Sequence, residues 1–175
     1  MDTQVKPAEQ APMQAAPQEQ HLWLQQLVGE WTSEAEMTTV PGGPPETCKS
    51  TESVRSLGGI WILAEGRGEM PGGGSATMLM TLGYDPGKKR YVGTWIGSMM
   101  THLWIYDGEL DASGRILTLN SEGPDMSPGA VPGRLAKYKD VIEIKAADHR
   151  ILTSHCLGED GTWWQFMTAH YRRTK

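Results

Sequence analysis

Five histidines provide the side chains in this sequence that are best suited to metal binding, haem ligation or proton transfer. Their spacing matches no HxH, HExxH or combined Cys/His pattern, so any such site would need His102, His155 and His170 to converge from separate segments. His155 and His170 fall in the last two predicted strands, where antiparallel pairing would allow the two rings to meet. Because no motif supports a site, we predict no metal and no cofactor, haem included, and keep the histidines as candidate pocket residues.

Carboxylates spaced two residues apart are the second group that could carry acid–base chemistry. Glu65 and Glu69 share a strand face with Arg67 between them, and Asp107 and Glu109 follow the same spacing. A general base needs burial to raise its pKa toward the working pH, and nothing in the sequence buries these groups. A solvated charged face is the simpler interpretation, so an enzyme is kept as an alternative and a non-enzymatic function is favoured.

Aromatic residues give a sharper signal, because side chains two positions apart in a strand lie on one face. Two such faces are aromatic and polar: Tyr91, Gly93, Trp95 and Gly97 in one segment, and His102, Trp104 and Tyr106 in the next. The opposite faces are mainly aliphatic and would make a filled core, whereas the aromatic faces would line a pocket with hydrogen-bonding groups. Alternation alone does not decide between them, and we favour the aromatic faces as the interior.

The predicted pocket also includes the first strand. If Trp31 points inward, so does Met37, and Glu34 and Glu36 then face water. Burial in a core is the usual role of large aromatics, and stacking on a ligand is the functional alternative. The predicted lining of the pocket is Trp31, Met37, Tyr91, Trp95, His102, Trp104, Tyr106, His155 and His170.

Ten alternating segments, separated by Gly-, Pro- and Asp-rich turns, must position these residues. The predicted strands are 30–39, 46–56, 60–69, 75–84, 89–97, 102–110, 115–121, 134–146, 149–157 and 162–172. Leu22 to Val28 suit a short amphipathic helix ending at Gly29. Residues 1–20 hold little to bury and predict a disordered leader before a single domain at 21–175, and the Pro/Gly-rich segment 121–133 predicts a mobile loop over a rim.

Ten consecutive strands must protect their edges, because an open sheet leaves two edges unpaired. Closure into an antiparallel up-and-down barrel removes both edges and encloses room for side chains or one small ligand. The short helix would then cap one end. The predicted fold is therefore an all-β barrel, and a two-sheet sandwich is the alternative.

Composition excludes several partners. A net charge of −5 with no long basic run argues against nucleic acid or an anionic membrane surface. No apolar stretch is long enough to span a bilayer, and the N-terminus lacks a secretory signal pattern, so the default prediction is a cytoplasmic protein. Cys48 and Cys156 match no metal motif and are interpreted as two reduced thiols.

Three segments together resemble known families. LVGEW at 27–31 is similar to the Gly-x-Trp start of lipocalins and fatty-acid-binding proteins, the calycin group. GYDPGKKRYVGTWIGSM at 83–99 and LGGIW at 57–61 resemble the bacterial domain family of unknown function 1579 (DUF1579). The resemblance covers nearly the whole chain after residue 20 and implies a calycin-like β-barrel with no established activity.

The same resemblance limits the choice of ligand. Fatty-acid-binding proteins end in an Arg-x-Tyr strand that reaches the ligand carboxylate, and here Tyr171, Arg172 and Arg173 replace that spacing. Nitrobindin-like haem barrels use a histidine near the C-terminus, but neither His155 nor His170 lies in a diagnostic motif. Three functions follow: a binder of a small apolar or aromatic ligand, an enzyme with acid–base groups in the pocket, and a filled barrel that forms a homodimer.

Overall fold

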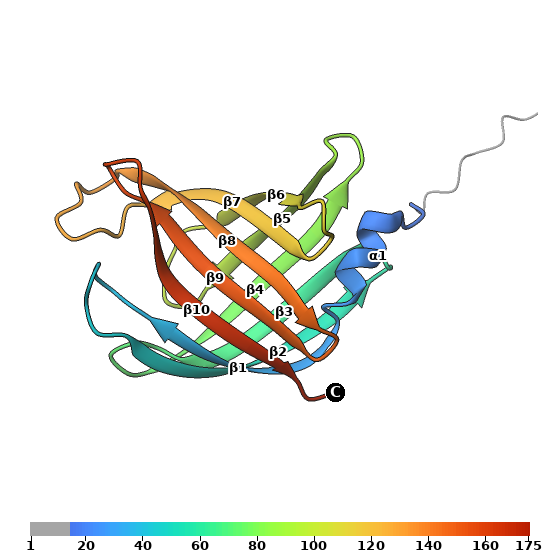
Figure 1. Ribbon diagram of the computed structural model, residues 1–175, viewed down its shortest axis with the longest axis horizontal. Helices are drawn as coiled ribbons and strands as arrows, with labels where there is room; N and C mark the ends of the chain where they lie inside the picture. Colours follow the sequence, from blue (N-terminus) through green and yellow to red (C-terminus); the bar gives the residue numbers. More distant parts are fainter. Residues whose placement is uncertain (1–14) are drawn as a thin grey trace, which may run out of the picture.

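The structure, a computed structural model, describes residues 15–175 as one helix followed by a ten-stranded sheet (Figure 1). The elements are α1 (Glu19–Gln25), β1 (Gly29–Met37), β2 (Glu46–Leu57), β3 (Trp61–Glu69), β4 (Ser75–Asp85), β5 (Arg90–Gly97), β6 (Trp104–Leu110), β7 (Ile116–Pro124), β8 (Leu135–Ala146), β9 (His149–Leu157) and β10 (Trp163–Arg173). Each strand pairs with the next in antiparallel fashion, and β1 also pairs with β10, so the sheet closes. The predicted barrel is confirmed, and the sandwich is wrong.

Two elements differ from the sequence prediction by more than two residues at an end. Helix α1 begins at Glu19, inside the predicted leader, and ends at Gln25, so Gly29 is the first residue of β1 and not a helix cap. Gly29 has φ 141°, and a Cβ there would collide with the Arg173 side chain and the Lys175 carbonyl. The other difference is that β7 continues to Pro124, which shortens the predicted 121–133 loop. The first 14 residues of the predicted leader lie outside the described residues.

The strands alternate as the sequence predicts. In β1, Trp31 is 3% exposed and faces the interior, whereas Glu34 and Glu36 are exposed on the outside. In β5 and β6, the aromatic faces and not the aliphatic ones point inward, with Trp95 opposite Trp104. Gly93 lies on the inward face of β5 because it alternates with Tyr91 and Trp95, and a Cβ there would overlap the backbone carbonyl of Thr81 in β4. The aromatic choice of interior is the one observed.

Helix α1 covers one end of the barrel (Figure 1). Leu24 and Leu27 are fully buried, which attaches this end of the chain to the barrel core. Trp23 donates its indole Nε1–H to the carbonyl of Gly114 at 2.7 Å, which fixes the helix to the turn between β6 and β7. A seven-residue helix is too short to be stable alone, so these contacts hold it in place.

The chain ends next to the same helix. Arg173, the last residue of β10, donates to the carbonyls of Val28 and Gln26 and lies over the Trp31 ring, 4.2 Å from its centroid. The backbone N–H of Thr174 donates to the carbonyl of Glu30 at 2.7 Å. These contacts complete the seam between β1 and β10. Within residues 15–175, no helix has the length and apolar character needed to cross a membrane.

Candidate ligand site in the barrel interior

The interior has two halves that differ in packing. At the α1 end, which we call the closed half, six large side chains are less than 2% exposed: Leu24, Leu27, Leu82, Leu117, Leu119 and Ile142. At the opposite end, the open half, side chains along the inner wall keep accessible surface: Met37, Met78, Met80, Trp95, Phe166 and Met167. A side chain that faces into a closed barrel and remains accessible borders space that protein does not fill. The inner wall of the open half is therefore packed less completely than that of the closed half.

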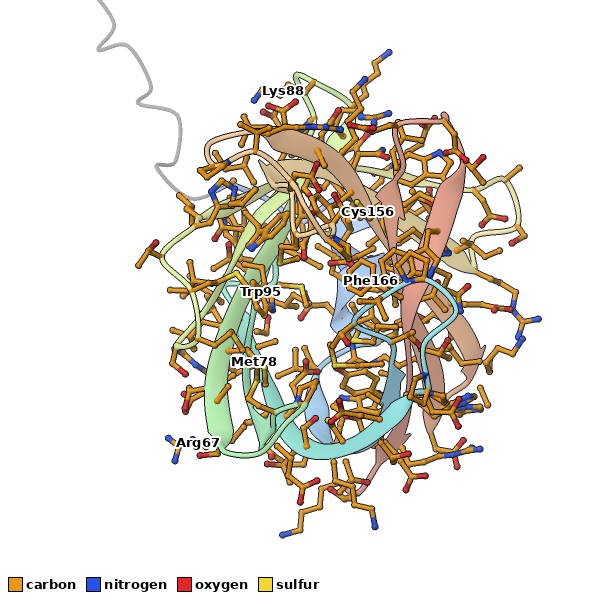
Figure 2. All side chains as sticks on the ribbon, turned by 90° about the vertical axis from the view of Figure 1, so that its left-hand side faces the viewer. Arg67, Met78, Lys88, Trp95, Cys156 and Phe166 are labelled. Atoms are coloured by element: carbon orange, nitrogen blue, oxygen red, sulfur yellow. The ribbon has the colours of Figure 1, made fainter. Side chains whose placement is uncertain are left out.

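Figure 2 looks into this open half from the end opposite α1. Met78 and Trp95 lie on one wall and Phe166 on the facing wall, with open space between them. The loops that surround this mouth join β1 to β2, β3 to β4, β5 to β6, β7 to β8 and β9 to β10. A ligand thus has a route into the barrel that does not require α1 to move.

Aromatic rings surround the open half. Trp104 meets Tyr138 edge to face with centroids 4.8 Å apart, Tyr138 meets Phe166 at 6.3 Å, and Phe166 meets Trp164 at 5.9 Å. Trp104 takes the space beside Gly123, where a Cβ would overlap its ring. The Tyr138 hydroxyl donates to the carbonyl of Pro124 at 2.6 Å, so the tyrosine is held in place. Trp104 and Tyr138 are buried by these contacts, so the partly exposed aromatic residues of the inner wall are Trp95, Trp164 and Phe166.

A buried ion pair lies below the open half. Arg150 in β9 donates through Nη2 to Glu52 in β2, and the two residues are 4% and 8% exposed. The guanidinium lies between two rings, 4.7 Å from the centroid of Trp31 and 4.3 Å from that of Tyr171. Burial raises the pKa of Tyr171 well above its usual range. The pair is neutral overall and is enclosed by the interior.

A second polar group lies between the two halves. The Asp140 carboxylate accepts hydrogen bonds from the Tyr106 hydroxyl and the Ser154 hydroxyl, each at 2.5 Å. Burial raises the pKa of Asp140 and the two hydrogen bonds oppose that rise, while burial and the nearby Asp140 charge raise the pKa of Tyr106 well above its usual range. Asp140 is half-buried, and within the described part of the chain no salt bridge joins it to a cation. It is an interior carboxylate whose side-chain hydrogen-bond partners are hydroxyl groups, and the nearby His155 also acts to lower its pKa.

The structure places His155 and His170 outside the barrel and apart from each other. His155 pairs with Gln165 and His170 pairs with Ile151, because the sheet has an irregular register between Gln165 and Met167. This irregularity shifts the inward positions of β10, so even-numbered residues after it face outward. His170 instead accepts or donates a 3.2 Å hydrogen bond with His149, and their rings stack with centroids 5.5 Å apart.

The third candidate histidine lies at the rim of the mouth. His102 precedes β6, and its Nε2 is 3.1 Å from the carbonyl oxygen of Glu122. Its ring meets the Trp104 ring edge to face, with centroids 4.9 Å apart. The three histidines therefore do not converge, and among residues 15–175 no group of three His, Cys, Asp or Glu side chains is arranged to hold a metal ion.

The other predicted pocket residues face the interior but divide between the halves. Trp31 and Tyr91 lie in the closed half, Tyr106 lies beside Asp140, and the remainder belong to the open half: Met37, Trp95 and Trp104. Burial raises the pKa of Tyr91 to about 12, and its hydroxyl has no hydrogen-bond partner among the described residues. Tyr91 is thus a packing residue of the closed half.

Four polar interior residues escaped the sequence prediction: Glu52, Asp140, Arg150 and Ser154. Each occupies a position that alternates with outward residues, as in Tyr138, Asp140 and Ile142 along β8. A polar or charged residue at an inward position of an alternating strand is the signal that could have identified these four residues. Cys48 and Cys156, both free thiols, also lie along the interior.

A depression on the outer wall is the alternative location for a site. It has a volume of about 620 Å³ and is open to solvent over β10, β1, β2 and β3. Its side chains are mainly outward polar and charged groups, among them Glu34, Lys49 and His170. Exposed charges that water already solvates offer little to a small apolar ligand. The interior, with its aromatic wall and half-buried carboxylate, is the stronger candidate.

The fold defines a class of protein: a calycin-like, closed antiparallel β-barrel with one short N-terminal helix that covers one end. The chain belongs to the family described as a protein of unknown function, DUF1579, which it matches over residues 16–173. The family resemblance seen in the sequence is thereby confirmed. No curated protein matches the chain.

Two solved structures share this fold. The crystal structure of Rv2717c from M. tuberculosis has a TM-score of 0.60 at 13% identity, covering 87% of this chain and 98% of that one. The S-type phycobiliprotein lyase CPES from Guillardia theta has a TM-score of 0.53 at 14% identity, covering 91% of this chain and 99% of that one. At these identities the likeness shows a common barrel architecture.

Proposed function

We propose that the protein binds a small apolar or aromatic molecule in the open half of the barrel. The observation that carries this proposal is the difference in packing along one closed interior. Leu82 in β4 is fully buried, whereas Met80, its neighbour on the same inward face, keeps accessible surface. An interior designed only for packing would bury both, because protein cores are filled to the density of organic crystals.

The lining supports this class of ligand. Trp95 and Phe166 supply partly exposed aromatic rings, and Met78 and Met80 supply flexible apolar side chains that adapt to a ligand's shape. Asp140 and Ser154 add a few fixed polar groups at the base of the space. A mostly apolar lining with few polar groups is typical of small-molecule sites.

Nile red, a neutral solvatochromic dye, tests whether the open half of the barrel can bind an apolar molecule. Its fluorescence should rise on binding, and fatty acids, retinoids, flavins and haem should then be screened by displacement of the dye and by intrinsic tryptophan fluorescence. Met80→Trp should fill the open half and weaken dye binding about tenfold or more, since it removes the volume that the dye occupies.

Leu79→Trp is the matched control, because Leu79 is the adjacent residue of β4 and lies 45% exposed on the outer face. It adds the same indole outside the barrel and should leave binding unchanged. The proposal fails if neither the dye nor any screened compound binds, or if both variants weaken the dye equally.

A further inference from the structure

The interior contains two charged sites, and the charge at each site is compensated in a different way. One is the Arg150–Glu52 pair, in which each charge has an opposite partner. The other is Asp140, whose partners are the hydroxyls of Tyr106 and Ser154. This difference bears on which ligand the open half accepts, an inference that rests on the proposed function.

Arg150 is a poor receptor for an anion. Its guanidinium is paired with Glu52 and lies between the Trp31 and Tyr171 rings. The residue is 4% exposed, and its Nε is buried without a hydrogen-bond partner among the described residues, so a ligand atom has almost no surface to reach. An anionic ligand would also meet the adjacent Glu52 carboxylate. The one buried arginine of the described interior therefore does not favour a carboxylate ligand.

Asp140 has the opposite character. It keeps accessible surface, and its two hydrogen bonds leave further lone pairs of the carboxylate free, since a carboxylate has about four acceptor positions. The side chain lies between the packed closed half and the open half, opposite Ser154 and Leu119. A donor group at the inner end of a ligand would reach a charge that protein cations do not neutralise.

The aromatic wall adds to this preference. The partly exposed rings of Trp95 and Phe166 border the same space, and the faces of aromatic rings attract cations. An ammonium group near Asp140 would thus meet one negative charge and several electron-rich faces, whereas a carboxylate would be repelled by both.

We propose that the open half binds an apolar or aromatic ligand whose inner end is an amine or another cationic nitrogen donor, held by Asp140. The chemical class is that of aromatic and alkyl amines, as opposed to fatty acids and other carboxylates. Asp140 acts as the specificity-determining residue, and Ser154 and Tyr106 orient its carboxylate.

Three naphthalene compounds of matched size test this inference on the full chain. 1-Naphthylmethylamine, 1-naphthalenemethanol and 1-naphthaleneacetic acid should displace Nile red in that order of affinity. The amine should bind about tenfold or more tightly than the acid, because hydrogen bonds to charged groups are stronger than neutral ones. This comparison uses the wild-type protein, so it does not depend on the folding of a variant.

Two variants then assign the preference to Asp140. Asp140→Asn should abolish the amine preference, whereas Ser154→Ala should enlarge it by releasing one carboxylate oxygen. Glu36→Gln is the matched control, because it removes the same charge from the exposed outer face of β1 and should leave the order unchanged.

The outcomes separate the two proposals. Nile red binding with the acid tightest, or with an amine preference that survives Asp140→Asn, would overturn the ligand class while the open half remains a binding site. Failure of Nile red to bind would instead remove the proposed function.

Discussion

The closed and open halves of this barrel are built from the same ten strands and the same alternation, yet they are packed differently. In the closed half, leucine and isoleucine side chains from the strands contact Leu24 and Leu27 from the α1 region, and these side chains have almost no solvent-accessible surface. In the open half none of the elements within residues 15–175 enters the barrel to meet the wall, and methionine side chains, Trp95 and Phe166 stay partly accessible. The segment that contains α1, through Leu24 and Leu27, therefore accounts for the closer packing at one end of the barrel.

The comparison also shows where polar groups are placed. Arg150 and Glu52, which lie toward the closed half, neutralise each other's charge, because an unpaired charge in a packed region is strongly unfavourable. Asp140 lies beside the open half and has only hydroxyl partners. A carboxylate without a cationic partner is tolerated beside the open half and not in the closed half, since solvent or a ligand can complete the hydrogen bonds of Asp140.

The largest effect is expected from breaking the buried ion pair. Arg150→Met leaves Glu52 buried and unpaired, so the free energy of unfolding should fall by about 3–5 kcal/mol. Urea denaturation measures this loss. The double variant Glu52→Leu/Arg150→Met should recover most of it, and a double variant as unstable as Arg150→Met would show that the charge itself is not the cause.

Truncation of neighbouring inward residues of β4 tests the difference in packing directly. Leu82→Ala should lower the free energy of unfolding by about 2–5 kcal/mol, because it leaves a cavity in a filled region. Met80→Ala should cost clearly less, since Met80 already borders open space. Equal losses in urea denaturation would contradict the division of the interior into two halves.

Two glycine substitutions make a finer comparison. Gly93→Ala would force a methyl group against the Thr81 carbonyl of β4, a rigid ladder position, and should destabilise by about 1–3 kcal/mol. Gly123→Ala would meet the Trp104 ring, and a side chain can shift more readily than the backbone carbonyl of a paired strand. Thermal unfolding should therefore rank Gly93→Ala as the more damaging change, and the reverse order would mean that the Trp104 ring is held rigidly.

The smallest expected effect is on the pH dependence of stability. Burial raises the pKa of Asp140 above its ordinary value, so the folded protein binds this proton more tightly than the unfolded chain does. The stability that comes from the protonated form is present below the ordinary carboxyl pKa and is lost as pH rises through the raised one. The melting temperature of Asp140→Asn relative to that of the wild type should therefore increase as the pH is raised from acidic to neutral.

Glu36→Gln, with its exposed carboxylate, is the control for that measurement and should show no such gain. A gain that Glu36→Gln shares, or a difference between Asp140→Asn and wild type that is constant with pH, would contradict the raised pKa.

Most of the fold could be predicted from the sequence, because period-two alternation and turn residues are local signals. The strand order followed from the need to pair the two edges of a ten-stranded sheet. The alternation of Trp31 with Glu34 and Glu36 identified the inner face of β1. The choice of face in β5 and β6 needed the structure, since both faces can be buried.

The site was less predictable, for two physical reasons. The register irregularity at Gln165–Met167 reverses which residues of β10 face inward, and the sequence has no signal for it, so His170 was assigned to the wrong side. Arg150 and Glu52 lie on strands far apart in the chain, and only closure of the barrel brings them together. Long-range pairing of charges is a property of the fold and not of any local pattern.

The seam between β1 and β10 has a consequence for how the protein forms. β1 can complete its pairing only after β10 has been made, because Trp31 pairs with Arg173, which is almost the full length of the barrel sequence away. Contacts of such long separation slow folding and leave strand edges exposed meanwhile. During synthesis, nine strands would emerge with β1 unprotected on one side, so the nascent chain is most prone to aggregate just before its final eleven-residue strand appears.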